Sequence, residues 1–197
     1  EKQKHLMAPM DDVMSAELEK ELRQKGIDVY CDATVTEILE EVGGLSCVIT
    51  PNGEGDPIKM RAGQILMAIG RRPNVEKLLG KDISLEMEGG KIAVNSDFET
   101  SERGIYAIGD VSARTQLAHV AAAQGTYVVE KIAGRPHSIK LEVVPNGMYV
   151  SLPIVPNCIY TDPEIATVGI TEEIAREKGL KVRCGHFSMR ENGKSII

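Results

Sequence analysis

Gly109 and Asp110 are the first residues in the sequence whose types and order could bind a ligand. Four apolar-leaning residues, 105–108, lead into them, and a helix is expected from about residue 117. In open α/β sheets, ligands bind beyond the carboxyl ends of parallel strands, where a glycine allows close approach to the backbone. An ionised Asp110 only accepts hydrogen bonds, which suits a sugar hydroxyl, and the N–H groups of a helix start suit a phosphate. Taken alone, the residue types leave open a turn or helix-capping role for Asp110.

The cysteines and histidines do not form a site by spacing. No C-x-x-C pair occurs, so neither a zinc site nor a redox dithiol is indicated, and four free thiols are expected. Free thiols are typical of a reducing compartment, which predicts a cytoplasmic location. The residues concerned are Cys31, Cys47, Cys158 and Cys184, together with His5, His137 and His186, which are predicted to lie on the surface.

Composition excludes several classes of function. The chain has 197 residues, of which 42% are hydrophobic and 26% charged, as in ordinary globular proteins. A net charge of -6, the absence of tryptophan and only two phenylalanines argue against nucleic-acid binding. No apolar run approaches the roughly 20 residues that cross a membrane. The chain opens without methionine and ends on the apolar "GKSII", so a segment of a longer protein is expected.

The first half of the chain predicts a helix followed by an antiparallel meander. Met14, Leu18 and Leu22 form an apolar stripe that predicts a helix over 11–25, ended by Gly26. A short strand is expected at 27–30. Two strand-like runs on either side of Gly43-Gly44 indicate a hairpin, and 51–57 is a second turn. Residues 58–69 then predict strand, turn and an apolar strand over 65–69.

The second half predicts a helix and then a separate unit. After an exposed strand and loop in 91–101 and the run at 105–108, a helix is expected over 117–133, closed by Gly134. The proline-rich interval 136–156 is the best domain boundary. Beyond it, strand, strand, helix and strand are expected up to residue 189, with Thr171 opening an N-terminally charged helix.

Three motifs, in order, resemble one family. "TSERGIYAIGDV" followed by "LAHVAAAQG" resembles the second flavin-binding signature of the pyridine nucleotide–disulfide oxidoreductases. "ILMAIGRRPN" resembles the return strand from that family's nicotinamide domain, and "CIYTDPEIATVGIT" resembles the opening of its dimerisation domain. "YTDPEIATVG" and "ENGKSII" are most similar to the dihydrolipoamide dehydrogenases. The resemblance covers essentially the whole chain.

The resemblance implies cofactor-binding residues for FAD and NAD. Asp110, with Gly109 before it, corresponds to the aspartate that holds the ribityl chain of FAD, and Ala118 to a residue whose backbone lies beside the flavin. Glu1 corresponds to the acid that accepts a hydrogen bond from the adenosine ribose of NAD. Val35 matches a position near the adenine, and the strand end that lines the nicotinamide cofactor site is matched by Ala68, Ile69, Gly70 and Arg71.

The implied architecture is α/β with α+β. Residues 1–70 are expected to be the C-terminal part of a Rossmann-like NAD-binding domain with its antiparallel meander. Residues 71–143 are expected to be the second FAD-binding segment, and 144–197 the start of an α+β dimerisation domain. The interval 140–160 is longer than the family's usual link.

The implied reaction is the oxidation of dihydrolipoamide through an enzyme disulfide and FAD to NAD, in a homodimer that works with a lipoyl-bearing subunit of a 2-oxo acid or glycine cleavage complex. NADP in place of NAD stays open. No G-x-G-x-x-G occurs, no two cysteines are separated by four residues, and the family's His and Glu pair belongs beyond residue 197. The segment alone is therefore expected to be inactive. Mercuric reductase, glutathione reductase, a flavin transhydrogenase and a non-catalytic nucleotide-binding or dimerisation module are the alternatives.

Overall fold

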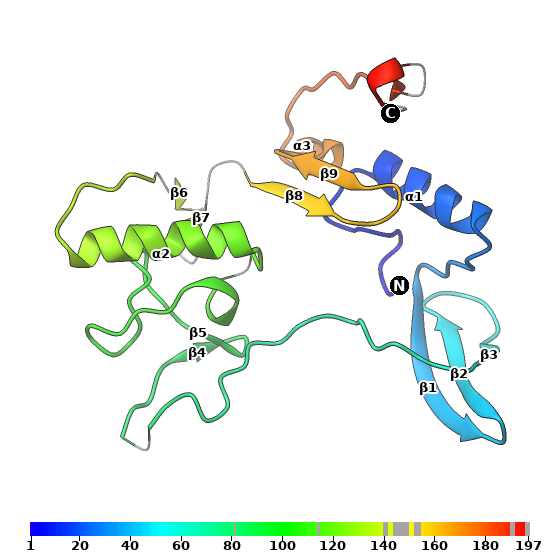
Figure 1. The fold of residues 1–197 in the computed structure, drawn as a ribbon, viewed down its shortest axis with the longest axis horizontal. Coiled ribbons are helices and arrows are strands. Elements are labelled where there is room, and N and C mark those ends of the chain that lie inside the picture. Colours follow the sequence, from blue (N-terminus) through cyan, green and yellow to red (C-terminus); the bar gives the residue numbers. More distant parts are fainter. Residues whose placement is uncertain are drawn as a thin grey trace. The chain divides into compact units, whose positions relative to one another are not determined.

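The computed structural model describes residues 1–80, 82–113, 115–139, 142–143, 150–151, 155–189 and 192–195. The chain divides into two compact units (Figure 1): residues 1–66 with 158–197, and residues 67–157. The first unit is built from both ends of the chain and the second from its middle. Helix and strand content is mixed, as the α/β class predicted. None of the described helices is long and apolar enough to cross a membrane.

The predicted N-terminal helix is confirmed as α1 (Asp12–Gln24), which the chain leaves through Gly26 at φ +79°. Leu18, in its apolar stripe, is 4% exposed and packs with Met10 and with Ile165 from the far end of the sequence. Burying a leucine of this kind contributes about 1.5–3 kcal/mol. The helix therefore joins the N-terminal and C-terminal segments of the first unit in one core.

The predicted meander is confirmed. β1 (Ala33–Glu41) pairs antiparallel with β2 (Gly44–Pro51), which pairs antiparallel with β3 (Ile58–Ala62). The register Glu41↔Gly44 leaves Val42 and Gly43 as the two-residue turn. Ser46 is fully buried and donates to the Glu41 carboxylate at 2.9 Å. The sheet is a three-stranded antiparallel ribbon in the order β1-β2-β3.

The C-terminal segment adds β8 (Pro156–Ile159), β9 (Ile165–Val168), α3 (Glu172–Glu177) and the short η3 (Gly193–Ser195). The predicted helix start is confirmed, since the Thr171 hydroxyl accepts from the Ile174 N–H at 3.2 Å. Asp11 lies just before α1 without capping it; its carboxylate instead accepts from the Glu172 N–H at 2.8 Å. An acid that precedes one helix therefore caps another.

The second unit is centred on α2 (Ala118–Ile132), which confirms the predicted helix and is followed by Gly134 at φ +64°. Phe98 and Val128 are buried against each other. Short antiparallel pairs accompany the helix: β4 (Met87–Glu88) with β5 (Lys91–Ile92), and β6 (Glu142–Val143) with β7 (Val150–Ser151).

A polar network joins α2 to the turn at residues 95–99. Lys131 donates to Asp97 at 2.7 Å, and the Tyr127 hydroxyl donates to the other oxygen of the same carboxylate at 3.2 Å. His137 is exposed, as predicted, and its ring stacks on Tyr127 with 3.8 Å between ring centroids. The Lys131 hydrogen bond lowers the pKa of Asp97 below its ordinary value.

This network predicts a pH-dependent stability. A carboxylate with a lowered folded pKa stabilises the fold above its unfolded pKa, and that contribution is lost as pH falls through the folded value. The difference in urea midpoint between wild type and Asp97→Asn is therefore expected to shrink below about pH 3.9. Asp82→Asn, an exposed site in the same unit, is the control and should show no such difference. If the difference in urea midpoint between wild type and Asp97→Asn stayed constant with pH, the lowered pKa of Asp97 would be contradicted.

Some predicted strands are not formed among the described residues. Residues 27–30, 65–69 and 180–188 have no strand assignment, and the run at 105–108 holds only one bridge, Glu99↔Tyr106. A strand needs a neighbour for its N–H and C=O groups, and sequence pattern does not supply one. Every ladder with a defined register is antiparallel, so no parallel edge lies beside Asp110 in the described structure. Most of the interval 140–154, with its predicted insertion, lies outside the described residues.

Candidate functional site

The junction between the apolar run and Asp110 is held by backbone and buried side-chain hydrogen bonds. Gly109 opens the short helix η1 (Gly109–Val111) at φ +67°, in the left-handed region that favours glycine. Its N–H donates to the side-chain oxygen of Gln124, 1% exposed on α2, at 2.8 Å. The Ser112 hydroxyl donates to the Ala107 carbonyl at 2.9 Å, and Ala113 N–H donates to the Gly109 carbonyl at 2.7 Å. These hydrogen bonds therefore fix the backbone that carries the Asp110 carboxylate.

Gly109 also allows α2 to come close. A Cβ built on Gly109 would lie 3.0 Å from the Cβ of Ala121, and one built on Gly125 would lie 3.2 Å from Ile108 Cδ1. The small residues on this face of α2 thus allow close contact with the junction. In the described structure the space beside Gly109 is taken by the helix.

Asp110 is half-exposed, and among the described residues its cationic neighbour is Arg71. Its side chain is 45% exposed, and its Oδ2 lies 3.7 Å from Arg71 Nη1. Arg71 is itself 77% exposed, so water screens this pair and it contributes little to stability. The carboxylate keeps accepting capacity for a further donor, and the guanidinium is a ready partner for a phosphate.

The remaining predicted residues of the second unit lie on two segments. Ala118 is exposed at the first position of α2, where the N-cap residue Leu117 supplies no side-chain acceptor to the N–H groups of the first turn. Ala68, Ile69 and Gly70 lie in an extended, exposed stretch, with Ile69 90% exposed. The structure brings Arg71, at the end of this stretch, to Asp110, and leaves the three residues before it open to solvent.

Val35 and Glu1 belong to the first unit. Val35 is 53% exposed on β1. The Glu1 carbonyl accepts from the Ala33 N–H at 3.0 Å, and the Glu1 carboxylate accepts from the Gln3 N–H at 2.8 Å. Glu1 therefore lies beside the start of the strand that carries Val35.

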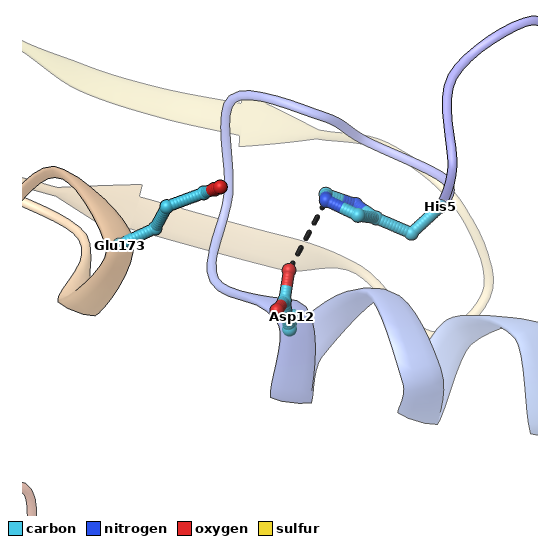
Figure 2. A group of neighbouring side chains, drawn as sticks. All are labelled: His5, Asp12 and Glu173. Atoms are coloured by element: carbon cyan, nitrogen blue, oxygen red, sulfur yellow. Dashed lines mark ion pairs between the residues drawn. The ribbon is translucent and has the colours of Figure 1, made fainter. Parts of the chain in front are cut away.

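Sequence reasoning missed a second cluster of chemistry-bearing side chains. His5 Nε2 lies 3.1 Å from Asp12 Oδ1, and the Glu173 carboxylate faces both (Figure 2). His5, predicted to lie on the surface, is partly buried, with 29% of its side chain exposed. No local spacing could have revealed the cluster, since Glu173 comes from the other end of the sequence.

Comparison with known proteins decides the family. The family described as "Pyridine nucleotide-disulphide oxidoreductase" matches residues 1–125, and its dimerisation domain matches residues 155–197. The chain belongs to the pyridine nucleotide-disulphide oxidoreductases. The resemblance drawn from the three motifs is thereby confirmed.

Curated relatives in this family are dihydrolipoyl dehydrogenases. That of Bacillus subtilis is 34% identical over 196 residues, which are 96% of this chain and 38% of the relative. That of Geobacillus stearothermophilus is 32% identical over 97% of this chain and 38% of its own length. The chain thus spans less than two fifths of these relatives.

Solved structures share the fold. LpdA from Mycobacterium tuberculosis matches with a TM-score of 0.70 at 25% identity, over 90% of this chain and 36% of its own. The HOCl-induced flavoprotein disulfide reductase RclA from Escherichia coli matches with a TM-score of 0.72 at 21% identity, over 91% and 38%. At that identity the second likeness concerns the fold alone.

Proposed function

We propose that this chain is part of an FAD-dependent dithiol/disulfide oxidoreductase that oxidises dihydrolipoamide with NAD as acceptor. The observation that carries the proposal is the match to curated dihydrolipoyl dehydrogenases over nearly the whole chain. The flavin and the nicotinamide supply the redox chemistry, and the protein binds and orients them. The chain lacks two cysteines separated by four residues, so on its own it is expected to be inactive.

Within that assignment, the junction at Gly109 fits the ribityl and phosphate part of FAD. Asp110 would accept from a ribityl hydroxyl, and the open N–H groups at Ala118 would face the flavin. Arg71 adds a cation beside Asp110, 3.7 Å from its carboxylate, at the end of the segment Ala68–Gly70 proposed for NAD. Val35 and Glu1 would serve the adenosine end of NAD, where the Glu1 carboxylate is an acceptor for ribose hydroxyls.

The proposed domains follow the same assignment: 1–70 from the NAD-binding domain, 71–143 from the FAD-binding domain and 144–197 from the dimerisation domain. A homodimer is proposed because a dimerisation-domain match covers residues 155–197. A lipoyl-bearing subunit of a larger complex would present the substrate.

The test is a purified full-length protein that carries this chain. We expect a yellow protein with flavin absorbance that reduces NAD⁺ with dihydrolipoamide. Activity with glutathione disulfide or Hg²⁺ and NADPH, without dihydrolipoamide turnover, would instead favour another member of the family. A colourless full-length protein that binds no added FAD would overturn the enzyme assignment.

A further inference from the structure

We propose that His5, Asp12 and Glu173 form a binding site for a divalent transition-metal ion of the zinc type. One ligand atom from each residue lies within 4.8 Å of the other two. His5 precedes α1, Asp12 opens it, and Glu173 lies in the first turn of α3 (Figure 2). The proposal is independent of the flavin and dithiol chemistry, since it uses none of the residues assigned to cofactors.

The distances fit a metal of this kind. Two ligands about 2.0–2.1 Å from a zinc ion at tetrahedral angles lie roughly 3.3 Å apart. His5 Nε2 and Asp12 Oδ1 are 3.1 Å apart. Glu173 is exposed, and a small change in its side-chain torsions would bring its oxygen from within 4.8 Å to that spacing.

The imidazole is oriented to present Nε2. Its Nδ1 lies 3.0 Å from the Leu6 carbonyl oxygen and 3.3 Å from the hydroxyl of Ser15, which is 1% exposed. A neutral imidazole has one N–H, and the Leu6 carbonyl can only accept it, so Nε2 is left as a lone pair that faces a carboxylate. His5 Nε2 and the Asp12 carboxylate are then two acceptors in contact, an arrangement that is stabilised by a cation between them. That cation is either a second proton on the ring or a metal ion. Metal-binding histidines commonly donate their other ring N–H to a carbonyl in this way.

The second carboxylate, that of Glu173, favours the metal. An imidazolium would satisfy Asp12 alone, whereas no described residue pairs with the Glu173 carboxylate, which Figure 2 shows directed toward His5 and Asp12. Both acids also line a cavity of about 430 Å³, through which an ion and its waters could enter. One nitrogen and two carboxylate oxygens suit zinc, cobalt or manganese, whereas magnesium and calcium prefer oxygen alone.

Neighbouring side chains could compete with the metal ion for the carboxylates, or with the proposed ligands for the metal ion. Arg183 lines the cavity, and Arg176 is paired with Glu172 at 3.2 Å, so the positive charge nearest α3 is already partly neutralised. Cys184 lines the same cavity, and its hydrogen bond to Glu172 raises the pKa of its thiol. A metal ion displaces the proton of a thiol that it binds, so Cys184 is a competing ligand. The experiment must therefore exclude the cysteines.

The test is calorimetric titration of ZnCl₂ into the full-length protein after its cysteines have been alkylated, with MgCl₂ as a comparison ion. We expect one zinc site that does not take magnesium. His5→Gln and Glu173→Gln should each weaken zinc binding by about tenfold or more, since even outer-shell changes at metal sites cost ten- to a hundredfold. Glu177→Gln is the matched control, because Glu177 is exposed on the same helix outside the cluster.

Cobalt gives a second readout. Co²⁺ bound by one nitrogen and two oxygens should show visible d–d absorption without a thiolate charge-transfer band, and Glu173→Gln should remove it. Zinc binding that vanishes on alkylation, or that His5→Gln and Glu173→Gln leave unchanged, would overturn the site and leave a His5–Asp12 ion pair only. Glu173 is exposed, so Glu173→Gln keeps the fold intact should His5→Gln disturb it.

Discussion

Replacing Gly109 with alanine is expected to lower the free energy of unfolding by about 2–5 kcal/mol. Gly109 has φ +67°, and a non-glycine residue in the left-handed region costs about 1–2 kcal/mol. The new Cβ would also lie 3.0 Å from Ala121 Cβ, and overpacking of this kind typically costs about 1–3 kcal/mol. Urea unfolding of the purified protein measures the sum.

Gly134→Ala separates the two costs. Gly134 has φ +64°, but nothing lies within 4 Å of where its Cβ would stand. We therefore expect it to show the backbone cost alone, about 1–2 kcal/mol. Equal losses for the two variants would mean that α2 yields freely to the added methyl group, and that close packing at the junction is not what requires glycine.

Removing the Asp110 carboxylate is expected to weaken FAD binding about ten- to a hundredfold, which corresponds to the roughly 1.5–3 kcal/mol of a hydrogen bond to a charged group. Asp110→Ala should purify with a lower flavin-to-protein ratio and should need more added FAD to regain flavin absorbance. The side chain is 45% exposed, and among the described residues its charged contact is a long one, with Arg71, so the fold should survive the change.

Asp82→Asn is the control for this loss, as an exposed acid elsewhere in the same unit. It should keep the full flavin content. An Asp110→Ala protein that binds FAD as tightly as wild type would show that the carboxylate is a turn residue, which is the alternative that the residue types alone allow.

Elements with local signals could be predicted from the sequence. α1 and α2 each fall within one residue of the predicted bounds, because an apolar stripe or a run of small residues marks their bodies and a glycine marks their ends. The hairpin of β1 and β2 followed from Gly43-Gly44 in the same way. Each of these signals involves residues that are close together in the sequence, and such local structure is what a sequence pattern can predict.

Features that depend on distant partners could not be predicted. The apolar run 65–69 has the composition of a buried strand, yet Leu66 is 89% exposed, because burial requires a neighbouring strand that the run cannot specify. The hydrogen bond between Asp11 and Glu172 spans 161 positions, and the grouping of His5 with Glu173 depends on the same juxtaposition. At the junction around Gly109, the residue types singled out Asp110, but the role of Gln124 in holding Gly109 appears only in the three-dimensional structure.

The unit assembled from residues 1–66 and 158–197 has a consequence for biosynthesis. Chains emerge from the ribosome amino end first, and domains generally fold as units. Leu18 and Met10 find Ile165 only after the whole intervening stretch has been translated, so their apolar surfaces stay open during that time. The nascent polypeptide should therefore rely on chaperones until its late residues emerge, and a translational stall before residue 158 should yield an aggregation-prone product.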